Sequence, residues 1–194
     1  MSQSGSIPRN GMSMSDEAKE LRDGIFSLYT RRFGTVAELL IEKLYGLSDS
    51  IDQHHDATDA NGNRIEIKFS RLLKKNQNRI TKDNVVEEAL KSSTANRALA
   101  YKDTKHYKFD CNIQQVKRTE FDILYYGIFF ADKIAVFSIN SDEILDLIGY
   151  SDFQHKGNEG EGQFHITNDT LDYHMNNYFK EWVTYEKLYN DFLI

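Results

Sequence analysis

The chain has 194 residues, of which 40% are hydrophobic and 12% aromatic, and its formal net charge at pH 7 is −6. This size and composition favour one globular domain with a sizeable core. The single cysteine, Cys111, excludes an internal disulfide and a zinc site built from several cysteines.

Residues 1–14 contain the only proline of the chain and lack the apolar centre of a signal peptide. We expect them to form a disordered leader, followed by a single domain over residues 15–194. The sequence contains no uninterrupted apolar run of about 18 residues, the length that a membrane-spanning helix requires. These features predict a cytoplasmic protein without a membrane partner.

The first predicted element is a helical region over residues 15–47, which begins at Ser15 with acidic residues in its first turn. We expect Gly34 to divide this region into two helices. The second helix should bury four aliphatic side chains, namely Val36, Leu39, Leu40 and Leu44. Two strands should follow, joined at the Asn61–Gly62 turn signal.

The second half of the chain alternates between the two kinds of pattern. A helix is predicted over 81–101, strands over 111–139 with a turn at Asp132–Lys133, a short helix over 141–150, and a helical tail over 167–193. Strands in the middle with helices on both sides predict an α/β fold, a central mixed β-sheet flanked by helices.

The segment "GNRIEIKFSR", residues 62–71, carries the most informative pattern. As a strand it places Ile65 and Ile67 on one face and Glu66 and Lys68 on the other, with those two side chains about 7 Å apart. An exposed ion pair is one explanation, and it would stabilise the strand by a fraction of a kcal/mol. The alternative is one half of a metal-dependent active site.

Hydrolysis of a phosphodiester requires an activated water and neutralisation of the charge that develops at phosphorus. Mg²⁺ held by a few carboxylates supplies most of this, and a nearby lysine can orient the water or stabilise charge. The segment "HDATDANGNRIEIK" provides an acid, Asp56, followed by Glu66 and Lys68 on the next strand. Glu38, beside the apolar face of the second helix, could complete the acidic shell.

Asp56, Glu66 and Lys68 together resemble the signature of the PD-(D/E)xK nucleases, as it occurs in type II restriction endonucleases. The resemblance extends over roughly residues 30–170, with one departure, because His55 stands where the signature nominally has proline. It implies a restriction-endonuclease-like core and Mg²⁺-dependent, sequence-specific cleavage of double-stranded DNA. In that case Asp56 and Glu66 would bind Mg²⁺, Lys68 would activate or orient the water, and Glu38 would support them.

The hairpin leaves two candidates for the first acid. A two-residue turn at Asn61–Gly62 places Asp59 on the same face as Glu66, whereas a three-residue loop over 60–62 places Asp56 opposite Glu66. The resemblance favours Asp56.

The distribution of charge predicts an anionic partner. Residues 64–82 contain seven Lys or Arg against one acid, and residues 97–118 contain six against two. Within the first stretch, Arg71, Lys74 and Lys75 are the predicted phosphate contacts. A solvated basic loop is the alternative.

Two segments could read bases. Gln114, Gln115 and Lys117 have side chains that suit the major groove, although they could equally form a polar edge strand. His155 and Lys156 belong to a glycine-rich segment that could approach a duplex or could be a simple surface loop.

Other functions are compatible with the same residues. A junction resolvase or a repair nuclease could use the same core, and a non-catalytic DNA-binding protein could contain Glu66 and Lys68 as an ion pair only. Cutting both strands needs two catalytic centres, so we expect a homodimer, joined through the aromatic C-terminal helix that includes Trp182. A monomer that nicks the strands one after the other is the alternative.

Overall fold

The computed structural model describes residues 14–50, 54–75, 78–153 and 159–192, and all structural statements below concern these ranges. The α-helices are α1 (Asp16–Ser27), α2 (Thr30–Tyr45), α3 (Val85–Lys91), α4 (Leu171–Asn177) and α5 (Tyr185–Phe192), with 3-10 helices at Tyr101–Asp103 and Ile144–Asp146. The strands are β1 (Ser48–Asp49), β2 (Ala57–Thr58), β3 (Arg64–Arg71), β4 (Asp110–Val116), β5 (Ile123–Phe129), β6 (Ile134–Asn140), β7 (Ser151–Phe153), β8 (Glu159–Thr167) and β9 (Phe179–Val183).

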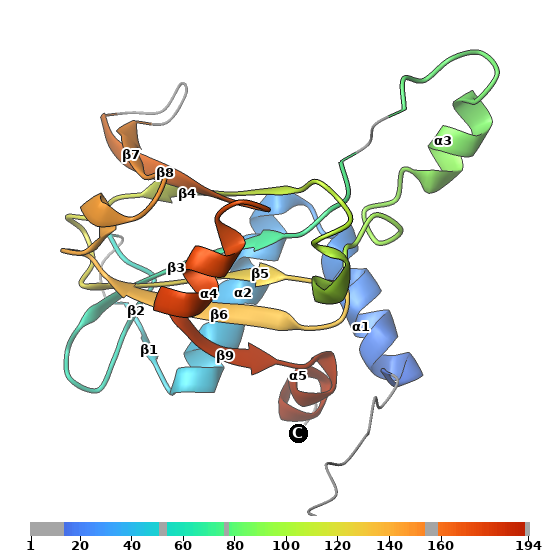
Figure 1. Ribbon diagram of the computed structural model, residues 1–194. Coiled ribbons are helices and arrows are strands. Elements are labelled where there is room, and N and C mark those ends of the chain that lie inside the picture. The colour runs from blue at the N-terminus through green and yellow to red at the C-terminus, as the bar shows by residue number, and fades with distance from the viewer. Residues whose placement is uncertain (1–13, 51–53, 76–77, 154–158, 193–194) are drawn as a thin grey trace, which may run out of the picture.

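The strands form two sheets, and the larger one is mixed. Its six strands run in the order β1-β2-β3-β5-β6-β9, with β3 and β5 parallel and the other neighbours antiparallel. The smaller sheet has the order β4-β8-β7 and is antiparallel. The prediction of an α/β fold with a central mixed sheet is therefore confirmed, but helices alone cover only one face, because the small sheet lies on the other face together with α4 (Figure 1).

Strand β5 shows why the large sheet lies at the centre. Leu124, Tyr126 and Ile128 contribute to one core, with β4, β8 and α4, whereas Tyr125 and Phe129 contribute to another, with α1, α2 and α5. A strand that is buried on both faces reads as a continuous apolar run, as the segment "ILYYGIF" does. The result is a layer of helices, the large sheet, and a layer formed by the small sheet and α4.

Strand β3 divides its side chains between these layers. Ile65 and Ile67 are buried in the core that includes α1 and α2, and the alternation of a strand turns Glu66 and Lys68 to the opposite face. The small sheet is on that side, because the thiol of Cys111 in β4 donates to the carbonyl of Arg71 at 3.9 Å. The two polar side chains of β3 thus lie on the side of the small sheet.

The first helical region does not divide at Gly34, contrary to expectation. The break lies at Leu28 and Tyr29, which are extended, and Gly34 lies inside α2. The guanidinium of Arg71 donates to the carbonyls of Phe26 and Leu28 at 2.7 and 2.6 Å. These bonds satisfy carbonyls at the end of α1, which explains why the helix stops there.

The burial predicted for α2 is only partly correct. Leu40 is buried and Val36 and Leu44 are half-buried, whereas Leu39 is 52% exposed. The buried stripe of α2 runs instead through Phe33, Ala37, Leu40 and Ile41.

The predicted tail helix over 167–193 is wrong in its middle. Residues of that segment form α4, then β9, then α5. Strand β9 pairs with β6, which would otherwise be an open edge of the large sheet. Trp182 of β9 packs against Tyr101 and Phe130, with ring centroids 4.8 and 6.0 Å away. Sheet pairing and aromatic packing therefore override the helical pattern.

Two further predicted helices are shorter than expected. Of residues 81–101 only Val85–Lys91 forms an α-helix, and of residues 141–150 only Ile144–Asp146 forms a 3-10 helix. Met14, the last residue of the predicted leader, packs against the core of α1 and α2, and residues 1–13 lie outside the described ranges. No helix in the described ranges is long and apolar enough to cross a bilayer.

Candidate active site

The hairpin of β2 and β3 has the register of a three-residue loop. Ala57 pairs with Ile65 and Thr58 with Arg64, and the amide of Asp56 donates to the carbonyl of Ile65 at 3.0 Å. The regular pairing ends at Ala57, and the Asp56 side chain contacts β3 beside Glu66, because the amide of Ile67 donates to Asp56 Oδ2 at 2.7 Å. Of the two registers that the sequence left open, the structure has that of the three-residue loop.

Asp59 has a different role in the same hairpin. Its carboxylate accepts hydrogen bonds from the amides of Asn61 and Asn63, both at 2.9 Å, and from the side chain of Asn63 at 2.8 Å. These hydrogen bonds, above all those from Asn63, lower the pKa of Asp59. The Asp59 side chain therefore stabilises the turn.

Lys68 joins the two acids. Its ammonium donates to Asp56 Oδ2 at 3.3 Å and to the carbonyl of Ile67 at 3.3 Å, and it forms an ion pair with Glu66 Oε1. Asp56 Oδ2 is held in place by the amide of Ile67 at 2.7 Å. Three oxygens, one from the residue before β2 and two from β3, thus converge on one position, which the ammonium occupies.

Burial makes this cluster electrostatically unusual. Glu66 is only 8% exposed, and its burial raises its pKa to about 7, against the opposing effect of Lys68. Burial also disfavours the charged form of Lys68, but the two carboxylates outweigh it and raise the pKa of the ammonium. The pKa of Glu66 and the pKa of Lys68 are therefore both raised. One ammonium is shared between two carboxylates, so its positive charge cannot fully offset the burial of Glu66.

Glu38 of α2 belongs to the same electrostatic cluster. Its pKa is raised by burial and then by the negative charge of Asp56, while the positive charge of Lys68 opposes the shift. When all three acids are ionised, Asp56, Glu66 and Glu38 carry three negative charges and Lys68 carries one positive charge. The excess of two matches the charge of one divalent cation.

The residues present fit a hard divalent ion. Within the described ranges, no three His, Cys, Asp or Glu side chains come together as a metal-ligating group. The nearest donors are the carboxylates of Asp56 and Glu66 and the carbonyl of Ile67, all oxygens. Mg²⁺ accepts such a set, because it commonly binds one or two carboxylates and keeps several waters.

Asp56, Glu66 and Lys68 line a polar cleft of about 180 Å³, which we call the acidic cleft. The other side chains that line the cleft are His54, His55, Gln115, Lys117, Glu120 and Glu161. Glu120 and Glu161 were not singled out from the sequence, since the first lies in a loop and the second on β8, far from the other acids in the chain. Only the packing of the small sheet against β3 brings them here.

Gln115 reaches this cleft because of a β-bulge in β4. The pairing with β8 shifts between Gln114 and Val116, and Gln115 has a φ of 59°. Without the extra residue, the alternation after the buried Ile113 would turn Gln115 toward the core. The bulge turns it outward and lets Val116 take the buried position. A left-handed conformation is costly for a glutamine, and such strain gathers at functional sites.

The other residues predicted to contact DNA lie in different places. Gln114 is exposed on β4 and pairs with Gln163. The Arg71 guanidinium is occupied with the carbonyls at the end of α1 and lies over the Phe33 ring. Lys74 and Lys75 follow β3, away from the acidic cleft, and His155 and Lys156 lie outside the described residues.

A scan against protein-family models finds no matching family, and a search of curated proteins finds no significant match. What the acidic cleft can do is therefore inferred from its own side chains.

Proposed function

We propose that the protein is a Mg²⁺-dependent endonuclease that cleaves double-stranded DNA, built on a restriction-endonuclease-like core. The observation that carries the proposal is the position of Lys68, whose ammonium is shared by Asp56, directly before β2, and Glu66 of β3. The register of the hairpin, the buried Glu66 and the excess of negative charge support it. The class of enzyme, a site-specific type II restriction endonuclease, rests on the resemblance of these residues to the PD-(D/E)xK signature.

In this proposal each side chain has a chemical task. Asp56 and Glu66 would hold the cation with the Ile67 carbonyl, and Glu38 would add negative charge nearby. A bound Mg²⁺ would lower the pKa of a water and neutralise charge at phosphorus. The Lys68 ammonium would move away from the carboxylates of Asp56 and Glu66 when these bind the cation. It would then contact the attacking water or a phosphate oxygen. Hydrolysis would join the water oxygen to phosphorus, break the bond between phosphorus and the departing oxygen, and transfer a proton from the water to that oxygen.

The test is cleavage of plasmid and genomic DNA with and without Mg²⁺. Discrete fragments that require Mg²⁺ would support a site-specific enzyme, whereas cutting confined to branched DNA would favour a junction resolvase. Lys68→Ala should lower the rate by about 10²- to 10³-fold, as the loss of one preorganised charge does elsewhere, while duplex binding persists. Lys19→Ala, on the exposed side of α1, serves as the control. Undiminished cutting by Lys68→Ala would refute the assignment.

A non-catalytic DNA-binding protein is the second candidate, and the ion pair of Glu66 with Lys68 favours it. Under this alternative the wild-type protein binds duplex DNA but cuts none in Mg²⁺, and Lys68→Ala changes neither property.

We also propose a homodimer, since cutting both strands at a fixed position needs two centres related by a two-fold axis. The interface expected from the sequence does not stand, because Trp182 lies in β9 and packs against Tyr101 and Phe130. Light scattering of the protein on a duplex tests the dimer. One chain per duplex with double-strand breaks would contradict it.

A further inference from the structure

An arm leaves the body of the protein after β3 and returns before β4. Its described part, residues 78–97, includes α3 and projects away from both sheets (Figure 1). The base of the arm is fixed to the body by a short ladder: the amide of Lys74 donates to the carbonyl of Arg97, and the amide of Leu99 donates to the carbonyl of Leu72. The arm therefore begins and ends in a paired, ordered segment.

A concave surface of about 700 Å³ lies where the arm joins the body, and we call it the basic cradle. It is lined by Lys74, Lys75, Asn78, Glu88, Lys91, Asn96, Arg97, His106, Tyr107 and Lys108. Five of these side chains are Lys or Arg and one is an acid, so the lining has a net charge of +4 with histidine neutral. On a chain whose net charge is −6, this is a local reversal of sign.

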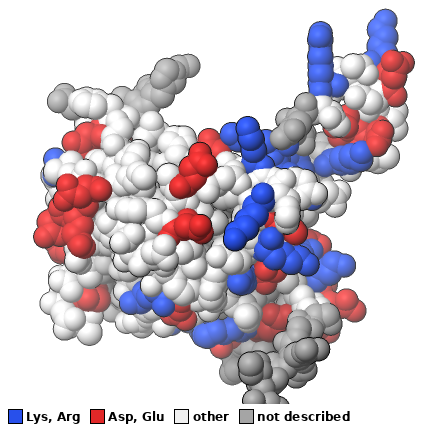
Figure 2. Space-filling view, viewed as in Figure 1, with Lys and Arg blue, Asp and Glu red and all other residues white. Residues whose placement is uncertain are grey.

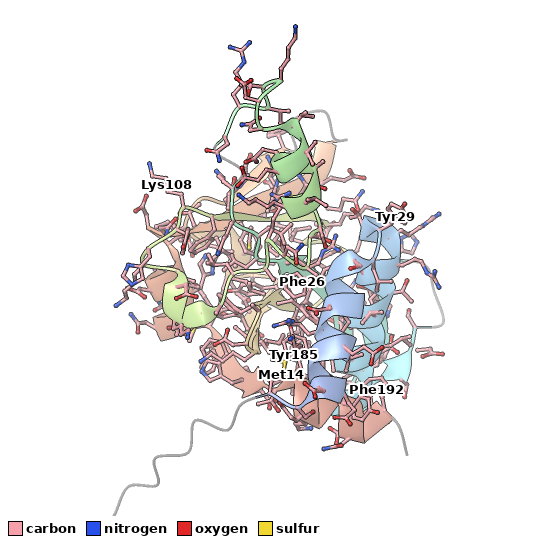
Figure 3. All side chains as sticks on the ribbon, turned by 90° about the vertical axis from the view of Figure 1, so that its right-hand side faces the viewer. Met14, Phe26, Tyr29, Lys108, Tyr185 and Phe192 are labelled. Atoms are coloured by element: carbon pink, nitrogen blue, oxygen red, sulfur yellow. The ribbon has the colours of Figure 1, made fainter. Side chains whose placement is uncertain are left out.

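The cations of the cradle are held in place from several elements. The Lys74 ammonium lies 4.4 Å from the centre of the Tyr107 ring, and the Arg97 guanidinium donates to the Lys74 carbonyl at 3.0 and 3.3 Å. The single acid, Glu88, accepts a hydrogen bond from Asn78 at 3.2 Å. Figure 2 shows basic side chains on the arm and at its junction with the body, and Figure 3 shows Lys108 pointing outward beside this junction.

Two strands connect the cradle with the acidic cleft. Lys75 follows Lys68 by seven residues along β3 and the segment after it, and Lys108, two residues before β4, precedes Gln115 by seven residues. The two strands lie together at the cradle, where the Lys75 ammonium is 3.9 Å from Asp110. At about 3.3 Å per residue, both paths give a separation of at most about 23 Å. Phosphates on one strand of B-DNA follow each other by about 3.4 Å along the axis, so this span corresponds to at most about seven base pairs.

We propose that the basic cradle is a second phosphodiester-binding site, which binds the backbone of the same duplex up to about seven base pairs from the acidic cleft. This inference rests on the proposed function, since it takes a duplex as the ligand. It assigns Lys108, Lys91, Asn96 and Arg97 to DNA binding, in addition to Lys74 and Lys75.

The experiment measures binding of labelled DNA hairpins, with stems of 5 and 16 base pairs, by fluorescence anisotropy over a range of KCl in EDTA. The double variant Lys75→Gln/Lys108→Gln changes two exposed cradle lysines. The control, Lys19→Gln/Lys187→Gln, removes the same charge from α1 and α5. On the long stem the cradle variant should bind roughly 10- to 100-fold more weakly at 0.1 M salt, and its salt slope should fall by about two units. The control variant should keep the wild-type slope.

The short stem separates a two-point grip from a general charge effect. It covers less of the path between the two sites, so the wild-type protein should bind it more weakly than the long stem and with a smaller salt slope. Asn96→Glu, which adds a negative charge to the cradle without removing a lysine, should also weaken binding of the long stem. Equal affinity of the wild-type protein for the two stems, or a wild-type salt slope in the cradle variant, would overturn the proposal. Failure of the proposed function would look different, because wild-type protein would then cut no DNA in Mg²⁺.

Discussion

The Glu66 carboxylate contacts the Lys68 ammonium on one face of β3, yet its pKa is raised, to about 7. Burial of the carboxyl group outweighs the attraction of a cation that it must share with Asp56. Because the pKa of this buried acid lies near neutral pH, small changes in its surroundings alter its charge.

Glu66→Gln should stabilise the protein at alkaline pH in the absence of divalent ions. Because the folded state raises the pKa above its usual 4.5, the protonated acid contributes stability at low pH, and this contribution is lost as the pH rises from about 4.5 through 7. The variant has no such proton to lose, so its advantage over wild type should grow by up to about 3 kcal/mol across this window. Urea denaturation at pH 5 and pH 8 measures it. Glu17→Gln, exposed on α1, is the control, and a constant difference at both pH values would contradict the prediction.

Asp56 and Asp59 should respond to alanine in opposite ways. Asp56→Ala removes a predicted cation ligand and should lower Mg²⁺-dependent cleavage about 100-fold or more. Asp59→Ala removes the acceptor of three hydrogen bonds in the turn and should lower the melting temperature. At temperatures where this variant is folded, cleavage should persist. Cleavage assays and thermal melting of both variants test these two expectations. An active Asp56→Ala protein beside an inactive Asp59→Ala protein would reverse the two assignments.

Gln115→Gly should separate stability from function. Glycine accepts a φ of 59° without strain, so the variant should gain about 1 kcal/mol of folding stability. It also loses the amide that lines the acidic cleft, so DNA cleavage or site preference should decline. Gln115→Asn, which tolerates the same backbone conformation and keeps a shorter amide, is the matched variant. If Gln115→Gly were more stable and fully active with the same site preference, Gln115 would have no part in substrate recognition.

Gly127 of β5 should not tolerate a side chain. A Cβ atom there would lie 2.1 Å from a ring carbon of Phe69 and 2.3 Å from the carbonyl oxygen of Ala135. Gly127→Ala should therefore destabilise the protein by about 3 kcal/mol. Gly24→Ala is the matched control, because nothing lies within 4 Å of its added Cβ in α1 and alanine favours a helix by about 1 kcal/mol. Equal melting temperatures for the two variants would show that β5 can shift to make room.

The sequence predicted those parts of the fold that depend on local pattern. The alternation in β3 put Glu66 and Lys68 on one face, and the turn at Asp132–Lys133 separates β5 from β6 as expected. The hairpin register could not be chosen from pattern alone. It depends on whether Asp59 or a neighbouring residue closes the loop, and in the structure the Asp59 amide pairs with the Asn63 carbonyl.

The parts that the sequence did not predict depend on distant partners. Strand β9 has a helical pattern but completes the edge of β6, and α1 ends where Arg71 reaches its last carbonyls. The bulge at Gln115 arises because Val116 fills a core position opposite β8. Likewise, Glu161 joins the cleft only through the small sheet. Each of these features is set by packing between elements, which no local window of sequence contains.

Cys111 gives the protein a natural chemical reporter. The chain has no other thiol, and this one is fully buried where β4 meets β3, with a pKa that burial raises to about 12. A thiol in this state does not react with alkylating reagents until the small sheet separates from the large one. The rate at which an alkylating reagent labels Cys111 in native conditions therefore measures how often the small sheet, which carries Gln115, separates from the large sheet. DNA that contacts both sheets would lower this labelling rate.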